Sequence, residues 1–78
     1  MSRLPVVTAS ELERVLVRLG FTAARRKGSH VFYRHPDGRT TTIPHHQGRD
    51  LARPLLREIL REVELTPEQF AKELLKKG

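Results

Sequence analysis

The strongest constraint on the fold is a turn between two runs of strand-forming residues. The turn is Pro36-Asp37-Gly38, in which proline presets φ, aspartate hydrogen-bonds the nearby backbone and glycine accepts positive φ. The run His30–His35 before it contains valine, phenylalanine and tyrosine, and Arg39–Ile43 after it is rich in threonine. β-Branched and aromatic residues favour strands. The sequence therefore predicts an antiparallel hairpin, which Pro44 ends.

A further strand is expected before this hairpin. It covers Phe21–Lys27 and reaches His30–His35 through the tight connection Gly28-Ser29. Side chains alternate between the two faces of a strand. The face that packs against helices is expected to carry Val31 and Tyr33. The other face is expected to carry His30, Phe32 and Arg34.

The first helix is expected over Ala9–Leu19. Thr8 and Glu11 have the spacing of a capping box, in which each side chain satisfies a backbone amide of the helix start. Apolar residues then recur with the helical period, and Gly20 suits the position just after a helix end. Residues Met1–Val7 before this helix are expected to form a loose lead-in.

Two more helices are expected in the second half of the chain. One runs over about Arg53–Val63 with Pro54 in its first turn, where proline is tolerated. The other runs over about Pro67–Lys76 with Thr66 as its N-cap. The buried stripe of the first of these is expected to be Leu55, Leu56, Ile59, Leu60 and Val63. The apolar residues of the second are Phe70, Ala71, Leu74 and Leu75.

The element order α-β-β-β-α-α predicts an α+β fold: a small three-stranded antiparallel sheet with helices on one face. A chain of 78 residues supports one hydrophobic core, so we expect a single domain over residues 1–78. No apolar run approaches the roughly 20 residues that a membrane span needs, and no signal-peptide pattern is present. Cysteine is absent, which excludes thiol chemistry and suits a cytoplasmic protein.

Positive charge is concentrated in the middle of the sequence. The net charge is +6, and residues 25–50 contribute six cations and two anions, a net +4. The flanking segments 1–24 and 51–78 contribute only +1 each. Such a concentration indicates a polyanionic ligand, most often a nucleic acid. The alternative is a solvated basic face that only improves solubility.

His30 is the leading candidate for a catalytic residue, because histidine exchanges protons near neutral pH and cations surround it in the sequence. The candidate phosphate contacts are Arg25, Lys27 and Arg34. Gly28-Ser29 would allow the backbone of a ligand to approach closely. The alternative interpretation of His30 is an ordinary surface histidine at the edge of the sheet.

The other histidines raise the question of a metal site. Zinc sites usually combine histidine with cysteine or carboxylate at regular spacing, which this sequence lacks. His45 and His46 are adjacent, so on an extended backbone their side chains point apart. His35 is expected to be a surface residue at the end of the hairpin. We therefore expect neither a metal nor a cofactor.

Several motifs in order along the chain resemble the HicA-like mRNA interferase toxins. They are Lys27-Gly28-Ser29-His30, His35-Pro36-Asp37-Gly38, Pro44 with His46 and Gly48, and Leu55-Leu56-Arg57-Glu58-Ile59-Leu60. The resemblance extends from the first helix to about Phe70. It depends on the order and spacing of these motifs, since a lone Gly-Ser-His would not be specific.

This resemblance implies a fold similar to double-stranded RNA-binding domains and a metal-independent activity that cleaves mRNA. It also implies neutralisation by a HicB-type antitoxin. The catalytic histidine of the family corresponds to His30, and its second histidine matches His46 better than His45. Ser29 and His46 thus join the residues expected to contact RNA.

RNA carries its own nucleophile, the 2′-hydroxyl group. An enzyme has to remove its proton, stabilise the negative charge that develops at phosphorus and protonate the leaving oxygen. One histidine does not fill both proton-transfer roles, and the second group is His46, Lys27 or water. Two other functions stay open: a non-catalytic RNA-binding module that does not need His30, and a protein-interaction domain whose charge matches an acidic partner.

Overall fold

The predicted hairpin is part of a three-stranded antiparallel sheet in the order β1-β2-β3. The strands are Thr22–Lys27 (β1), His30–Arg34 (β2) and Thr40–Pro44 (β3), each within one residue of its expected bounds. The computed structural model describes residues 4–76, so residues 1–3 and 77–78 of the expected domain lie outside the described residues.

One extra residue in β1 determines which side chains of β1 lie on the same face of the sheet as which side chains of β2. Ala23 pairs with Tyr33 and Arg25 pairs with Phe32, so β1 advances two residues where β2 advances one, and Ala24 forms a β-bulge. After the bulge, Lys27 pairs with His30. Arg25 and Lys27 therefore share the face of Phe32 and His30.

Within residues 4–76, three helices complete the fold: α1 (Ala9–Arg18), α2 (Arg53–Glu62) and α3 (Pro67–Leu75). Capping boxes begin two of them, one formed by Thr8 with Glu11 and one by Thr66 with Gln69. Each helix ends one residue before its expected end, because the expected last residue is the C-cap. The α+β fold with order α-β-β-β-α-α is confirmed.

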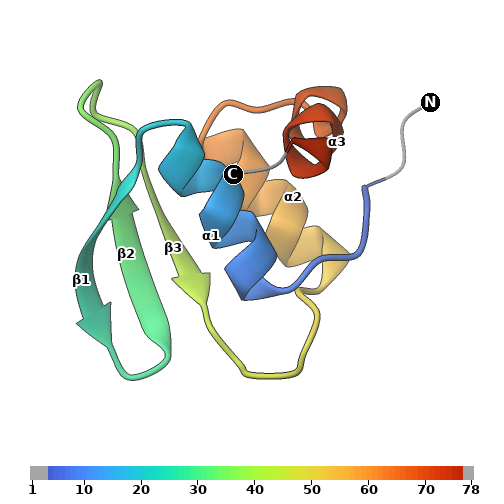
Figure 1. The fold of residues 1–78 in the computed structure, drawn as a ribbon. Coiled ribbons are helices and arrows are strands. Elements are labelled where there is room, and N and C mark those ends of the chain that lie inside the picture. Colours follow the sequence, from blue (N-terminus) through green and yellow to red (C-terminus); the bar gives the residue numbers. More distant parts are fainter. Residues whose placement is uncertain (1–3, 77–78) are drawn as a thin grey trace.

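The hydrophobic core lies between one face of the sheet and the helices. In Figure 1 the helices stand to one side of the sheet, with β3 nearest to them and β1 farthest away. Val31, Tyr33 and Ile43 bury their side chains on this covered face, as predicted for the first two. All six residues of β1 are exposed, so this strand projects beyond the helices. The opposite, open face of the sheet is available to a ligand.

Two expectations, for the lead-in and for Leu55, are wrong. The lead-in is not loose over residues 4–7, because Leu4 and Val7 are buried and the backbone N–H of Leu51 donates to the Val7 carbonyl at 2.8 Å. Leu55 is 36% exposed because it lies in the first turn of α2, beside the buried stripe rather than in it. Leu75 is 85% exposed because it is the last residue of α3, at the periphery of the core.

His35 is partly buried, so the expectation of a surface residue is also wrong. Its ring Nε2–H donates to the carbonyl of Leu19 at 3.0 Å, and its Nδ1 accepts the backbone N–H of Asp37 at 3.1 Å. The ring also packs edge-on against Phe21, with centroids 4.9 Å apart. A Cβ atom on Gly20 would lie 2.8 Å from the His35 Nε2, and the φ of Gly20 is +107°. Glycine is thus required there to bring the hairpin end onto the end of α1.

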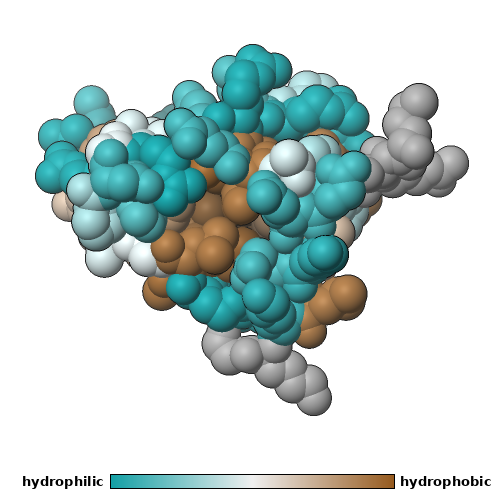
Figure 2. Space-filling view, turned by 90° about the horizontal axis from the view of Figure 1, so that it is seen from above, coloured by the Kyte–Doolittle hydropathy of each residue, from teal (hydrophilic) through white to brown (hydrophobic). Residues whose placement is uncertain are grey.

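Seen from the top of Figure 1, the molecule has apolar surface in a hollow surrounded by hydrophilic side chains (Figure 2). The partly buried apolar residues that pack against the core are Leu19, Leu65 and Leu74. Within residues 4–76, none of the helices has the length and apolar character that crossing a membrane requires.

Candidate active site

The open face of the sheet is built from cross-strand rows of side chains. In one row, His30 of β2 is paired with Lys27 of β1 and with Pro44 of β3. In the next row, Phe32 is paired with Arg25 and Thr42. Side chains directly opposite each other in such rows have Cβ atoms about 4.5–5.5 Å apart. The sheet therefore gathers a histidine, an aromatic ring and two cations within a small area.

The His30 side chain is exposed and available to a ligand. Among residues 4–76, no side chain or backbone group holds its ring through a hydrogen bond or ion pair. The turn before it is open as well, because Gly28 has a φ of +59° and no atom within 4 Å of the position where a Cβ would stand. Both ring nitrogens can therefore reach a bound molecule.

A shallow depression of about 420 Å³ occupies this part of the open face. Its lining consists of Arg25, Lys27, His30, Phe32 and Thr42. Arg34 lies just beyond it, with its guanidinium carbon 5.8 Å from the centroid of the Phe32 ring. The three cations expected to contact phosphate are thus gathered around His30 and Phe32, and they make the local field favourable to an anion.

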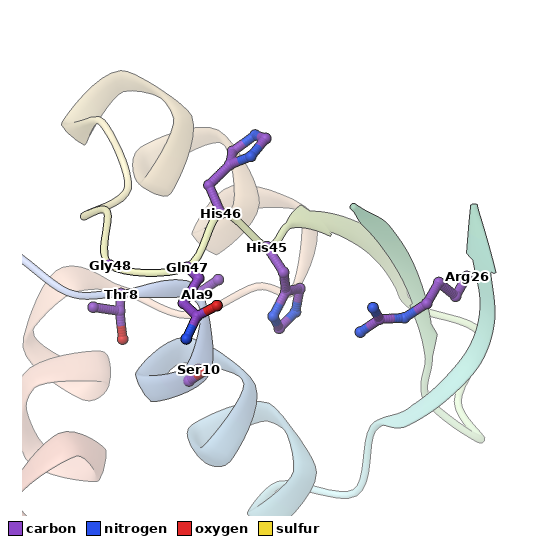
Figure 3. Close-up of a pocket in the computed structure, with 8 residues that line it drawn as sticks. All are labelled: Thr8, Ala9, Ser10, Arg26, His45, His46, Gln47 and Gly48. Carbon is purple, nitrogen blue, oxygen red and sulfur yellow. The ribbon is translucent and has the colours of Figure 1, made fainter. Parts of the chain in front are cut away.

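Ser29 and His46 have other positions. The Ser29 carbonyl accepts the backbone N–H of His45 at 2.7 Å, which ties the β1–β2 turn to the segment after β3. His46 does not line the depression that contains His30. It lines a second cavity of about 490 Å³, with Arg26 and the first residues of α1. In Figure 3 the ring of His46 points away from that of His45, as their adjacency predicts.

The second cavity lies on the other side of the sheet from His30. Figure 3 shows Arg26 extending from β1 toward His45, while Ser10 lies on α1 below. Arg26 pairs with Val31, which has its side chain on the covered face. Arg26 is therefore separated from Arg25 and Lys27. Of the three consecutive cations, Arg26 lies on the covered side of the sheet and the other two lie on the open face.

His45 belongs to a polar cluster at the edge of the core. Tyr33 donates its hydroxyl proton to Glu13 Oε2, so its oxygen accepts the Nε2–H of His45, with 2.8 Å between the two atoms. Burial, followed by the nearby carboxylate of Glu13, raises the pKa of Tyr33 well above its ordinary value. This cluster holds the His45 ring in one orientation, which indicates a structural role for His45.

The family model described as "HicA toxin of bacterial toxin-antitoxin" matches residues 9–65 of the chain. The chain belongs to the HicA toxin family. Among curated proteins, none matches the sequence. The HicA match begins at the first residue of α1 and includes the whole sheet and α2. Every candidate site residue lies inside it, whereas α3 lies outside.

Membership of the HicA family makes this protein a toxin of the toxin–antitoxin type, with an antitoxin as its partner. Within the described residues 4–76, no group of three or more histidine, cysteine or acidic side chains is arranged to hold a metal ion. Two features were not predicted from the sequence: the place of Thr42 in the depression and the polar cluster around His45. Alternation had put Phe32 beside His30, but it could not reveal the hydrogen bonds between Glu13, Tyr33 and His45.

Proposed function

We propose that this HicA family member is an endoribonuclease that cleaves mRNA with His30 as its catalytic residue. The observation that carries the proposal is the state of the His30 ring, which is exposed and is not held by any other residue among those described. The ring also has Lys27 as its cross-strand neighbour and Arg25 in the same depression. A free imidazole beside cations suits proton transfer at a phosphate. Membership of a toxin family that generally consists of mRNA interferases supports the same function.

In the proposed reaction, His30 takes the proton from a 2′-hydroxyl group of the RNA. The 2′-oxygen then forms a bond to the adjacent phosphorus, and the bond from phosphorus to the 5′-oxygen of the next nucleotide breaks. The products are a 2′,3′-cyclic phosphate and a 5′-hydroxyl end. General base catalysis of this kind contributes typically about 10² to 10⁴-fold to a rate.

The cations stabilise the charge that develops during this reaction. Lys27 is the register partner of His30, so we assign it to the reacting phosphate and to protonation of the leaving 5′-oxygen. Arg25 lines the same depression, and Arg34 lies beside Phe32, so these two contact the flanking phosphates. His46 lines the other cavity and is therefore a weaker candidate for the second acid–base group.

The antitoxin in this proposal is a HicB-type protein with an acidic surface that covers the open face. Exposed cations on β1 favour such a partner, because complementary charge speeds association and fixes the orientation of a complex. A bound antitoxin of this kind would shield His30 from RNA. Co-expression of the antitoxin should then relieve the growth inhibition that the toxin causes alone.

The decisive experiment compares purified wild-type protein with His30→Ala and His46→Ala on the same RNA, in the presence of a chelator. We expect wild type and His46→Ala to leave 2′,3′-cyclic phosphate ends, and His30→Ala to lose about 10² to 10⁴-fold in cleavage rate. A substrate with one 2′-deoxy sugar at the cut site should resist cleavage because the nucleophile is missing.

Circular dichroism and RNA binding separate loss of chemistry from loss of structure. His30 is exposed, so His30→Ala should change the free energy of unfolding by no more than about 0.5 kcal/mol. It should still bind RNA through the arginines. A folded His30→Ala variant that cuts at the wild-type rate would contradict the assignment, and a wild-type protein that binds RNA without cutting it would be a non-catalytic module.

A further inference from the structure

Phe32 is an aromatic residue in a position where the core does not require one. It lies on the central strand with its side chain on the open face, and it is not among the residues that form the hydrophobic core. The core is complete on the opposite face, where the neighbours Val31 and Tyr33 are buried. Phe32 instead lines the depression that contains His30. Its ring is therefore part of the candidate active site.

Two arginines lie beside this ring, but neither is in close contact with its face. The guanidinium carbons of Arg25 and Arg34 lie 5.5 Å and 5.8 Å from its centroid. Both distances are near the limit of roughly 6 Å for a cation–π attraction, so the attraction is weak. Neither guanidinium group has a hydrogen-bond or ion-pair partner among the described residues, so both can move onto phosphates when a ligand takes the ring face.

We infer that Phe32 is the stacking platform for an unpaired base, so that the protein takes single-stranded RNA rather than duplex RNA. This inference rests on the proposed ribonuclease function. An aromatic ring flanked by cations is the combination with which proteins bind single-stranded nucleic acid: the ring stacks on a base and the cations follow the backbone. In an A-form duplex each base is already paired and stacked, so its face is not available to a side chain.

The position of Phe32 relative to His30 connects the platform with the cleavage site. The two residues are separated by one residue on the same strand, which puts them about 7 Å apart along β2 and on the same face. A base stacked on Phe32 would therefore belong to a nucleotide next to the phosphate at His30. Thr42 is the cross-strand partner of Phe32, and its exposed hydroxyl group can donate or accept a hydrogen bond at the edge of that base.

The test uses a short oligouridine RNA with one 2-aminopurine base, whose fluorescence is quenched when the base stacks on an aromatic ring. All proteins carry His30→Ala, so that binding is measured without cleavage. The parent should quench the probe and bind it more tightly than the same strand annealed to its complement. Adding Phe32→Leu should remove the quenching and weaken binding by about 5- to 140-fold, whereas Phe32→Tyr should retain both.

Val17→Ala is the matched control, because Val17 is an exposed apolar residue of α1 outside the depression, and it should change neither signal. The inference is overturned if the parent binds the probe without quenching, if it prefers the duplex, or if a folded Phe32→Leu variant quenches as the parent does. Cleavage by the wild-type protein is assayed separately. If Phe32 stacks on the probe but wild type does not cut RNA, the platform stands and the ribonuclease proposal fails.

Discussion

The two faces of strand β2 differ in how their side chains are held. On the covered face, Tyr33 is fully buried and its hydroxyl group is hydrogen-bonded to Glu13 and to His45. On the open face, His30 is exposed, and the half-buried ring of Phe32 has two arginines beside it at the edge of the cation–π range. Neighbouring residues of one short strand thus differ in role, because alternation places one set of side chains in the core and the other set on the open face.

The two histidines near the end of the sheet illustrate the same difference. The His45 ring is fixed by Tyr33, whereas within residues 4–76 nothing fixes the ring of His30. A side chain with its partners inside the protein contributes to stability and is less available for chemistry. The contrast predicts that substitutions on the covered face mainly change stability, and that those on the open face mainly change activity.

The largest difference in stability is expected between the variants Tyr33→Ala and Phe32→Ala, with Tyr33→Ala the less stable. Removing the buried ring of Tyr33 should cost about 3–5 kcal/mol, the range for large-to-small substitution of an aromatic residue in a core. Phe32→Ala should cost less than about 1 kcal/mol, since its ring lies on the open face outside the core. Urea unfolding followed by circular dichroism measures both. Equal losses would mean that the open face is also part of the folding core.

A smaller loss of stability is expected at high pH. Burial and Glu13 raise the pKa of Tyr33, so above an ordinary tyrosine pKa of about 10 the unfolded chain loses this proton while the folded chain keeps it. The stabilisation is fully present below pH 10 and falls as the pH rises beyond that value, by at most about 1.4 kcal/mol per pH unit. Unfolding of wild type and Tyr33→Phe should be compared from pH 9 upward. Parallel curves for the two proteins would show that Tyr33 is not the group responsible.

The smallest difference in stability is expected between substitutions of two neighbouring threonines of β3. Thr41 is buried on the covered face and donates its hydroxyl proton to Glu62 Oε1 at 2.7 Å, so Thr41→Val should cost about 0.5–1.5 kcal/mol. Thr42 is exposed on the open face, and Thr42→Val should stay within about 0.5 kcal/mol. Chemical denaturation resolves the difference when both variants are measured together. A larger loss at Thr42 would reverse the assignment of the two faces.

Local sequence signals were sufficient for most of the fold. The turn at Pro36-Asp37-Gly38, the capping box at Thr8, the N-cap at Thr66 and the alternation in β2 each depend on residues close together in the chain, and each was predicted correctly. The bulge at Ala24 was not visible, because it arises from pairing between strands. The burial of His35 was missed for a related reason, since its partner Leu19 lies at the end of α1.

The candidate site was predictable to the extent that it depends on one hairpin. Arg25, Lys27 and His30 follow from alternation and from a tight turn, and the resemblance to HicA toxins pointed to the same histidine. The positions of His45 and His46 could not be predicted, because they depend on how the segment after β3 crosses the start of α1. That crossing is a tertiary contact between segments more than 30 residues apart in the sequence.

The bulge in β1 also bears on how copies of this protein meet one another. In the part of the chain that the structure describes, β1 pairs with β2 on one side only, so its other side presents unpaired backbone groups to which a strand of a second molecule could add. The bulge at Ala24 bends and twists this edge, and the cations Arg25, Arg26 and Lys27 follow directly. Two such edges approaching each other would bring like charges together along a distorted ladder. The strand that supplies cations to the depression therefore also opposes edge-to-edge polymerisation of the sheet.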